Sequence, residues 1–250
     1  MKYQKFKFPK NKKLKLVFLG DVHHGSKFSD TEKFKSTIAN IKKDKNIKVI
    51  ITGDLIENAS AGSVGAGVYQ QTSNPAEQVK EVCAMLAPIK NQVLYMHEGN
   101  HEERSFRFGG YSIGQPIADF LGVPYLEHMA LTDLVVGKQT YRIYTWHGYG
   151  GGQTTAYRIK TLQKQAETFS ADLYAMGHVH ELFATTMPHR EIVNGEFKDI
   201  FNHYVLTGAY LKWDESYAEQ HGYRMVKMGA PLATFDNKEK QINVDLEWEE

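Results

Sequence analysis

The 250-residue sequence has a single cysteine, Cys83, and no long hydrophobic run. One cysteine excludes an internal disulfide and a thiolate metal site, so we expect a reducing, cytoplasmic environment. No apolar stretch approaches the roughly 18 residues that span a membrane. Residues 1–20 are basic but lack the apolar region and small-residue cleavage site of a signal peptide. These absences predict a cytoplasmic protein with no membrane partner.

Neither sign of charge is in excess over the whole sequence, because the formal net charge is only +1 at pH 7. The distribution is uneven: residues 1–50 hold fourteen lysines and four acidic residues, so the rest of the chain is acidic. A basic N-terminal arm over residues 1–13 could attract nucleic acid. A lysine-rich run more often forms a solvated surface, which is the interpretation that we favour.

Apolar, β-branched runs predict strands over residues 14–20, 47–53, 92–98, 141–147 and 172–177. Helical patterns separate several of them. Ser29 and Glu32 form a capping box before one helix, and Asn74 with Pro75 begins another. A third follows Thr155, with Ile159, Leu162 and Phe169 along one face. Strands that alternate with helices predict an α/β sandwich with parallel pairing.

The sequence contains no repeat or low-complexity linker, so we expect one domain over residues 1–250. Residues 130–146 predict two strands around Gly137, and Asn194–Gly195 is typical of a β-hairpin turn. The small, polar stretch 58–74 predicts a flexible loop beside one end of a sheet. Such a loop could be functional or a tolerated surface insertion.

Asp, Asn and His side chains follow each of the five predicted strands. In open α/β sheets, ligands bind at the carboxyl ends of the strands. Oxygen and imidazole ligands suit Mn, Fe, Zn or Ni rather than calcium. Residues i and i+2 of a strand point the same way, so Asp21 with His23, and His178 with His180, can each enter one cavity. With Asp21 and Asp54 as the only carboxylates, two divalent ions would keep about two positive charges, which attract phosphate.

The motifs appear in a fixed order, and each follows a predicted strand. They are Asp21-x-His23, Gly53-Asp54, Gly99-Asn100-His101-Glu102, His147-Gly148 and Gly177-His178-x-His180. This order resembles the calcineurin-like metallophosphoesterases, a family whose fold is a sandwich of two mixed sheets flanked by helices. The resemblance covers residues 21–180 and weakens beyond about Thr207.

The resemblance implies a site with two divalent metal ions, of which manganese is our first choice. Asp21, His23, Asp54 and His180 would hold one ion; Asp54 would bridge to a second ion held by Asn100, His147 and His178. A metal-bound hydroxide would attack phosphorus in line. His101 would stabilise or protonate the leaving oxygen, and Glu102 is one candidate to orient it.

Two departures narrow the expected substrate. The second block reads GDLIENAS, without the arginine that protein phosphatases of this superfamily carry there. The close His178-x-His180 pair resembles the phosphodiesterase and nuclease branches. We therefore expect hydrolysis of a phosphodiester, in nucleic acid or a nucleotide. The alternatives are a phosphomonoesterase, including a protein phosphatase, and a non-catalytic scaffold of the same fold.

Three further residues lie near the motifs. His24 could contact substrate, although a plain turn position is the interpretation that we favour. Arg104 could bind a phosphate with two hydrogen bonds. His97 precedes the third motif, and we expect it to support the ligands without binding metal itself. The oligomeric state cannot be predicted from these patterns.

Overall fold

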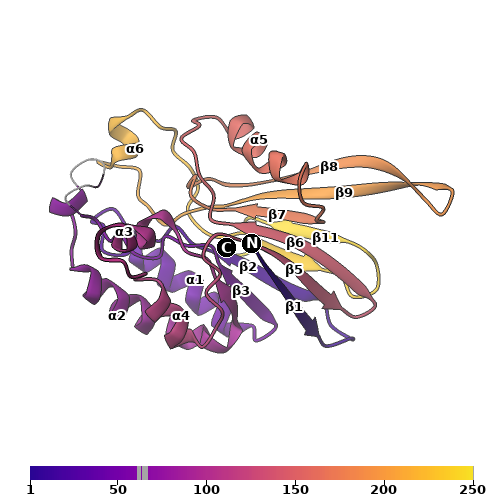
Figure 1. The fold of residues 1–250 in the computed structure, drawn as a ribbon, viewed down its shortest axis with the longest axis horizontal. Coiled ribbons are helices and arrows are strands. Elements are labelled where there is room, and N and C mark those ends of the chain that lie inside the picture. Colours follow the sequence, from indigo (N-terminus) through magenta and orange to yellow (C-terminus); the bar gives the residue numbers. More distant parts are fainter. Residues whose placement is uncertain (61–62, 64–66, 250) are drawn as a thin grey trace.

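The chain folds into two β-sheets packed face to face, with helices on both outer sides (Figure 1). This computed structural model describes residues 1–60, 63 and 67–249. One sheet has the strand order β1-β5-β6-β7-β9-β8 and the other β11-β10-β2-β3-β4. Both sheets contain parallel and antiparallel pairs, which confirms the predicted α/β sandwich of two mixed sheets.

The strands of the first sheet are β1 Lys2–Phe8, β5 Met129–Val136, β6 Gln139–Trp146, β7 Leu173–Met176, β8 Leu182–Val193 and β9 Glu196–Thr207. Those of the second are β2 Leu14–Leu19, β3 Ile47–Ile51, β4 Val93–Met96, β10 Leu232–Phe235 and β11 Ile242–Asp245. The α-helices are α1 Thr31–Lys43, α2 Pro75–Leu86, α3 Asn100–Gly109, α4 Gln115–Leu121, α5 Thr155–Ala166 and α6 Tyr217–Gln220. Two 3₁₀ helices cover Gly67–Tyr69 (η1) and Ala87–Gln92 (η2).

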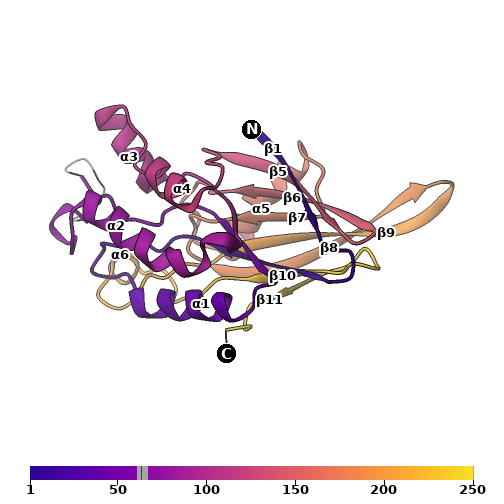
Figure 2. The ribbon, with the colours of Figure 1, turned by 90° about the horizontal axis from the view of Figure 1, so that it is seen from below.

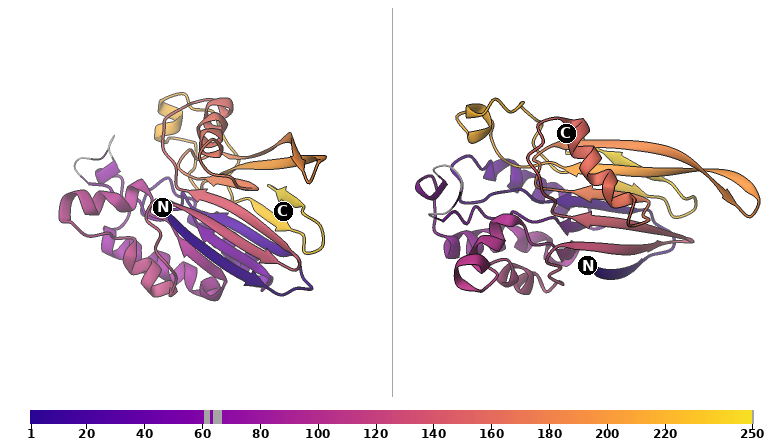
Figure 3. Two further views of the ribbon diagram at one scale, coloured as in Figure 1. Left: turned by 45° about the vertical axis from the view of Figure 1, so that its right-hand side comes forward. Right: turned by 45° about the horizontal axis from the view of Figure 1, so that its top comes forward.

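The apolar core lies in three layers. Between the sheets, residues such as Phe18, Tyr95 and Tyr141 are fully buried. Helices α1, α2 and α4 lie side by side on the outer face of the second sheet (Figure 2). Helix α5 packs on the opposite outer face, against β7 and β9 (Figure 3). This arrangement buries both faces of the central strands and leaves their carboxyl ends free to build a site.

Most predicted elements are confirmed, with shifts at their ends. The hairpin turn at Asn194–Gly195 joins β8 to β9, and both residues have positive φ angles, as a tight hairpin requires. The capping prediction for α1 is wrong by one residue: Asp30, not Ser29, is the N-cap and accepts from the Lys33 amide. Phe169 packs beside α5 but lies beyond its end.

The basic N-terminal segment begins with an edge strand. Residues 2–8 pair in parallel with β5, and the lysines of β1 are exposed. Two later lysines form ion pairs, Lys13 with Asp236 at 2.7 Å and Lys15 with Asp44 at 2.8 Å. Part of the positive charge of this segment is therefore balanced by carboxylates elsewhere in the chain.

The loop predicted over residues 58–74 falls partly on 61–62 and 64–66, which lie outside the described residues. Within the described part, the Gln71 side chain both donates to and accepts from the backbone of Ala59. Across the described residues, no helix combines the length and the apolar character needed to cross a membrane.

Candidate metal centre

The loops that follow β2, β3, β4, β6 and β7 meet at one edge of the sandwich. Strands β2, β3 and β4 are parallel neighbours in one sheet, and β6 and β7 are parallel neighbours in the other. Their carboxyl ends therefore lie on the same side. All seven residues predicted to bind metal come from these loops and from the first residue of α3: Asp21, His23, Asp54, Asn100, His147, His178 and His180.

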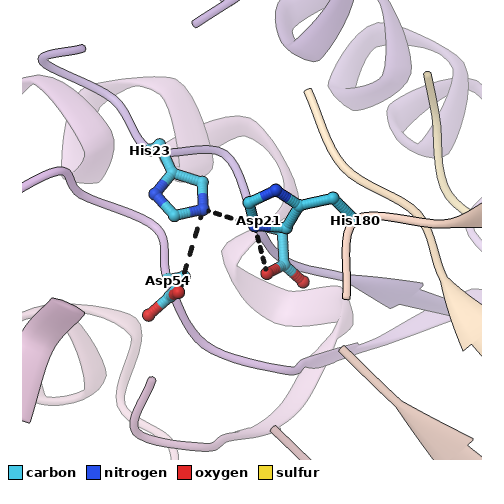
Figure 4. A group of neighbouring side chains, drawn as sticks. All are labelled: Asp21, His23, Asp54 and His180. Atoms are coloured by element: carbon cyan, nitrogen blue, oxygen red, sulfur yellow. Dashed lines mark hydrogen bonds and ion pairs between the residues drawn. The ribbon is translucent and has the colours of Figure 1, made fainter. Parts of the chain in front are cut away.

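A first group of side chains comprises Asp21, His23, Asp54 and His180 (Figure 4). One candidate ligand atom from each lies within 4.8 Å of the others. His23 Nε2 is 3.0 Å from His180 Nε2, which is itself 3.3 Å from Asp21 Oδ1. Three of these side chains are buried and His180 is partly exposed, so the group opens to solvent on the His180 side.

A second group comprises Asp54, His147 and His178, with Asn100 beside them. The Asn100 Oδ1 atom is 3.0 Å from His147 Nε2 and 2.8 Å from His178 Nδ1. The two imidazoles therefore converge on one amide oxygen. Of the two closely spaced histidines after β7, His178 joins this group and His180 joins the first.

The carboxylate of Asp54 belongs to both groups. Its Oδ2 atom lies 3.3 Å from His147 Nε2 and 3.8 Å from His23 Nε2. The other oxygen, Oδ1, accepts the backbone amide of His101 at 2.8 Å, which fixes the orientation of the carboxylate. One side chain thus connects two adjacent sets of donors.

The backbone at these positions is left-handed. Among the described residues, nine non-glycine residues have positive φ angles, and five of them are Asp21, His23, Asp54, His178 and His180. Such conformations cost about 1–3 kcal/mol each and gather at functional sites. Asp21 and His23 do face one cavity, as expected. The expected reason, the alternation of side chains along an extended strand, is wrong, because both residues have positive φ angles. These side chains are aimed by left-handed turns.

Glu102 holds the loop after β3 in place. Its buried carboxylate accepts the backbone amides of Asp54 at 2.9 Å and Leu55 at 2.7 Å, and that of Gly99 at 3.0 Å. Gly99 is needed here because a Cβ atom would collide with Asp54 Oδ1. The prediction that Glu102 orients His101 is therefore wrong, since its oxygens are occupied by backbone amides.

The acid that faces His101 is Glu57. Its backbone carbonyl is 2.8 Å from His101 Nδ1, and its Oε2 atom is 3.6 Å from the same nitrogen. Glu57 Oε2 also lies 3.4 Å from His23 Nδ1. The sequence offers one signal for this role, an acid three residues after Asp54, although the turn that aims it is not visible in the sequence.

Burial and neighbouring charges act against each other at this site. Burial disfavours protonated His147, but the Asp54 carboxylate prevails and raises the pKa of His147 to about 10. Burial also opposes the charged form of Asp54, yet the facing histidines hold its pKa well below the usual range. Burial lowers the pKa of His101 to about 3, so that ring is neutral. Burial and then the Asp54 charge raise the pKa of Glu102 to about 7.

The other three residues singled out in the sequence, Arg104, His24 and His97, contact different parts of the structure. Arg104 lies beside His101, with its Nη2 atom 2.8 Å from His101 Nε2. His24 belongs to neither group, and its Nε2 atom is 2.7 Å from Glu81 Oε2 of α2. His97 is buried behind the site, 2.8 Å from Thr145 Oγ1.

The donor set fits divalent cations. The Thr52 carbonyl lies 2.8 Å from His147 Nδ1 and so holds the proton of a neutral ring on that atom. His147 Nε2 would then present a lone pair to two acceptors, Asp54 Oδ2 and Asn100 Oδ1. Acceptors that face one another need a cation between them, either a proton or a metal ion. The raised pKa of His147 has the same cause.

Comparisons with known proteins find similar solved structures at low sequence identity. A comparison with curated proteins finds no match. Among solved structures, a predicted phosphoesterase from Streptococcus pneumoniae TIGR4 is 12% identical, with 93% of this chain and 89% of that chain covered and a TM-score of 0.41. Vps29 complexed with zinc from Entamoeba histolytica is 13% identical, with 93% and 97% covered and a TM-score of 0.41. Nuclease MPE from Pseudomonas putida is 13% identical, with 91% and 85% covered and a TM-score of 0.40.

The family comparison covers most of the chain. The model of the calcineurin-like phosphoesterases, a family of metal-dependent phosphoesterases, matches residues 14–225. That range contains both groups of candidate ligands as well as His101 and Arg104. The chain belongs to the calcineurin-like phosphoesterase family.

Proposed function

We propose that this protein hydrolyses a phosphodiester, in nucleic acid or a nucleotide, with two divalent metal ions bound at its paired donor groups. The observation that carries the proposal is the shared Asp54 carboxylate, whose Oδ2 atom faces histidines of both groups. The first ion would be held by Asp21, His23, Asp54 and His180, and the second by Asp54, Asn100, His147 and His178. The donor set suits manganese, with iron, zinc or nickel as alternatives.

Two bound ions would acidify a water molecule and bind phosphate oxygens. The protein itself supplies the groups around the leaving oxygen. His101 Nε2 lies 3.9 Å from Asp54 Oδ2, so the ring borders both groups of ligands. Glu57 fixes this ring through its carbonyl, and the same carbonyl accepts from Arg104 at 2.8 Å. We assign to His101 the hydrogen bond to the leaving oxygen, for which Nε2 must exchange its contact with Arg104 for a proton, and to Arg104 the stabilisation of the developing charge.

Three features support a diester substrate. The His178-x-His180 pair and the absence of an arginine in the second motif favour the phosphodiesterase and nuclease branches. In addition, Lys2 pairs with Ala130, which pairs with Thr145 two residues before His147. The basic strand β1 therefore begins at the edge of the sandwich that carries the site, where an extended nucleic acid could follow it. We place the activity in the cytoplasm, since the single cysteine suits a reducing compartment.

The test compares bis(p-nitrophenyl) phosphate with p-nitrophenyl phosphate, using metal-stripped protein reloaded with manganese. We expect faster turnover of the diester, with about two manganese ions per chain by mass spectrometry. Asp54→Asn should lose turnover and part of the bound metal. Asp30→Asn, which alters a carboxylate at the N-cap of α1 and not a ligand, serves as the matched control.

Each other outcome selects an alternative. Faster monoester turnover would make the protein a phosphomonoesterase. Two bound ions without turnover of either ester would favour the non-catalytic scaffold. Full turnover by Asp54→Asn would contradict the shared role of that carboxylate.

A further inference from the structure

A cavity of about 290 Å³ lies beside His101, between the start of the 58–74 loop, the first turn of α2 and the outer side of α3. Its lining includes Asn58, Ser60, Pro75 and Arg104. None of these residues belongs to the two groups of candidate metal ligands. The volume lies near the lower end of the range for small-molecule sites, about 300–1,000 Å³, and suits a single nucleoside.

The polar end of the cavity is joined to His101. Arg104 lines the cavity, and its Nη2 atom is 2.8 Å from His101 Nε2. Asn58 also lines it, and its Nδ2 atom donates to the His101 carbonyl at 2.7 Å and to Ser105 Oγ at 3.0 Å. A phosphate bound next to His101 would thus place one of its ester arms at the mouth of this cavity.

The other end of the cavity is aromatic. Phe108 and Tyr111 line it, yet they remain 70% and 58% exposed to solvent. The Tyr111 ring lies against Gly109, where an added Cβ atom would be 3.0 Å from Cε1 of the ring. Two exposed rings beside an arginine provide flat faces and a positive charge. That combination binds nucleobases of single-stranded nucleic acids by stacking, with little preference for sequence.

We propose that this cavity binds the nucleobase of one ester arm of the substrate, so that the enzyme prefers nucleoside diesters to alkyl diesters. This inference rests on the proposed function, because it assigns a specificity site to the same reaction. Arg104 marks the boundary between the two parts: the phosphate side faces His101 and the base side faces Phe108 and Tyr111.

The first test measures binding without metal. Metal-free protein is titrated into 2-aminopurine riboside 5′-monophosphate, whose fluorescence falls when the base stacks on an aromatic ring. Phe108→Ala and Tyr111→Ala should each weaken binding about five-fold or more. The control is Phe106→Ala, because Phe106 is 58% exposed on the same helix but does not line the cavity. All three residues are exposed, so the melting temperatures should stay close to that of the wild type.

The second test measures specificity with manganese-loaded protein. Thymidine 5′-(p-nitrophenyl phosphate) and methyl p-nitrophenyl phosphate release the same product, but only the first carries a base. The ratio of their kcat/KM values should fall about five-fold or more in Phe108→Ala and stay unchanged in Phe106→Ala.

The two proposals fail in different ways. Metal-loaded protein that turns over neither ester would overturn the proposed function, whatever the fluorescence shows. Turnover with the same ratio in wild type, Phe108→Ala and Phe106→Ala, together with equal quenching in all three, would overturn the nucleobase site alone.

Discussion

Replacement of Glu102 should destabilise the protein far more than replacement of its neighbour Glu103. Glu102 is fully buried, and its two oxygens accept backbone amides of Asp54, Leu55 and Gly99 at 2.7–3.0 Å, with a longer contact to Ile56 at 3.4 Å. Glu103 instead pairs with Arg107 on the surface of α3. The comparison therefore isolates the buried contacts.

The expected loss in unfolding free energy follows from the number of backbone amides that lose their acceptor. A buried donor left unsatisfied costs about 1–3 kcal/mol. Three short contacts then give about 4 kcal/mol for Glu102→Ala, because water entering the space would satisfy part of the loss. Glu102→Gln keeps one oxygen as an acceptor but turns an NH₂ group toward backbone donors, so we expect about 2 kcal/mol. An exposed pair such as that of Glu103 contributes less than about 1 kcal/mol.

Urea denaturation of the metal-free variants provides the assay, with the unfolding free energy extrapolated to water. The loss of about 4 kcal/mol expected for Glu102→Ala approaches the total stability of many domains, so that variant would not fold well enough to measure. Glu102→Gln is therefore the informative variant. Glu102→Gln should also weaken manganese binding, since the Asp54 loop loses its anchor. If Glu102→Gln and Glu103→Gln unfold at the same urea concentration, Glu102 does not hold the Asp54 loop.

Further predictions concern metal, pH, charge and a helix cap. Chelation of metal should lower the melting temperature of the wild type more than that of Asp54→Asn, because ligand binding stabilises only the folded state and the variant binds less metal. In metal-free protein, His147 has a pKa of about 10 against 6.5 for the unfolded chain. Its stabilisation is complete below pH 6.5 and is lost as the pH rises toward 10, so urea midpoints should fall over that window and His147→Gln should flatten the slope. If oligonucleotides follow β1, Lys→Gln changes at residues 2, 5 and 7 should reduce the salt dependence of binding; a wild type insensitive to salt would contradict this. Asn74→Ala should cost about 1 kcal/mol in thermal unfolding, because Asn74 caps α2 in a capping box with Glu77; a change near zero would contradict the cap.

The strand ends of the site were predictable from sequence because two simple signals coincide there. Apolar, β-branched runs predict buried strands, and polar residues that follow a glycine mark the turn beyond four of the five strands, His147 being the exception. Asp54 after Gly53 and Asn100 after Gly99 both fit this rule. Parallel strands then bring such turns to one edge, even though the residues are far apart in the chain.

The contacts around His101 were not predictable in the same way. Glu57 faces His101 from a turn in which Asp54 and Asn58 both adopt left-handed backbone conformations. Asp and Asn adopt such conformations more readily than most residues, but the sequence does not specify which of them do. Glu102 follows His101 directly, yet in α3 successive side chains point in different directions, and its carboxylate turns to the backbone of the neighbouring loop. The sequence also did not predict which strands pair, since nothing in residues 2–8 specifies β5 as the partner of β1.

The pairing of β1 with β5 has a consequence for synthesis of the protein. The ribosome completes β1 about 120 residues before it reaches β5, which at about 5–20 residues per second is a delay of roughly 6–24 s. During that time β1 has no strand partner, and a free apolar strand is a template for aggregation. The lysines at positions 2, 5 and 7 interrupt its apolar residues and repel the same strand in a neighbouring chain. The charge of this strand thus protects the nascent chain until its partner emerges.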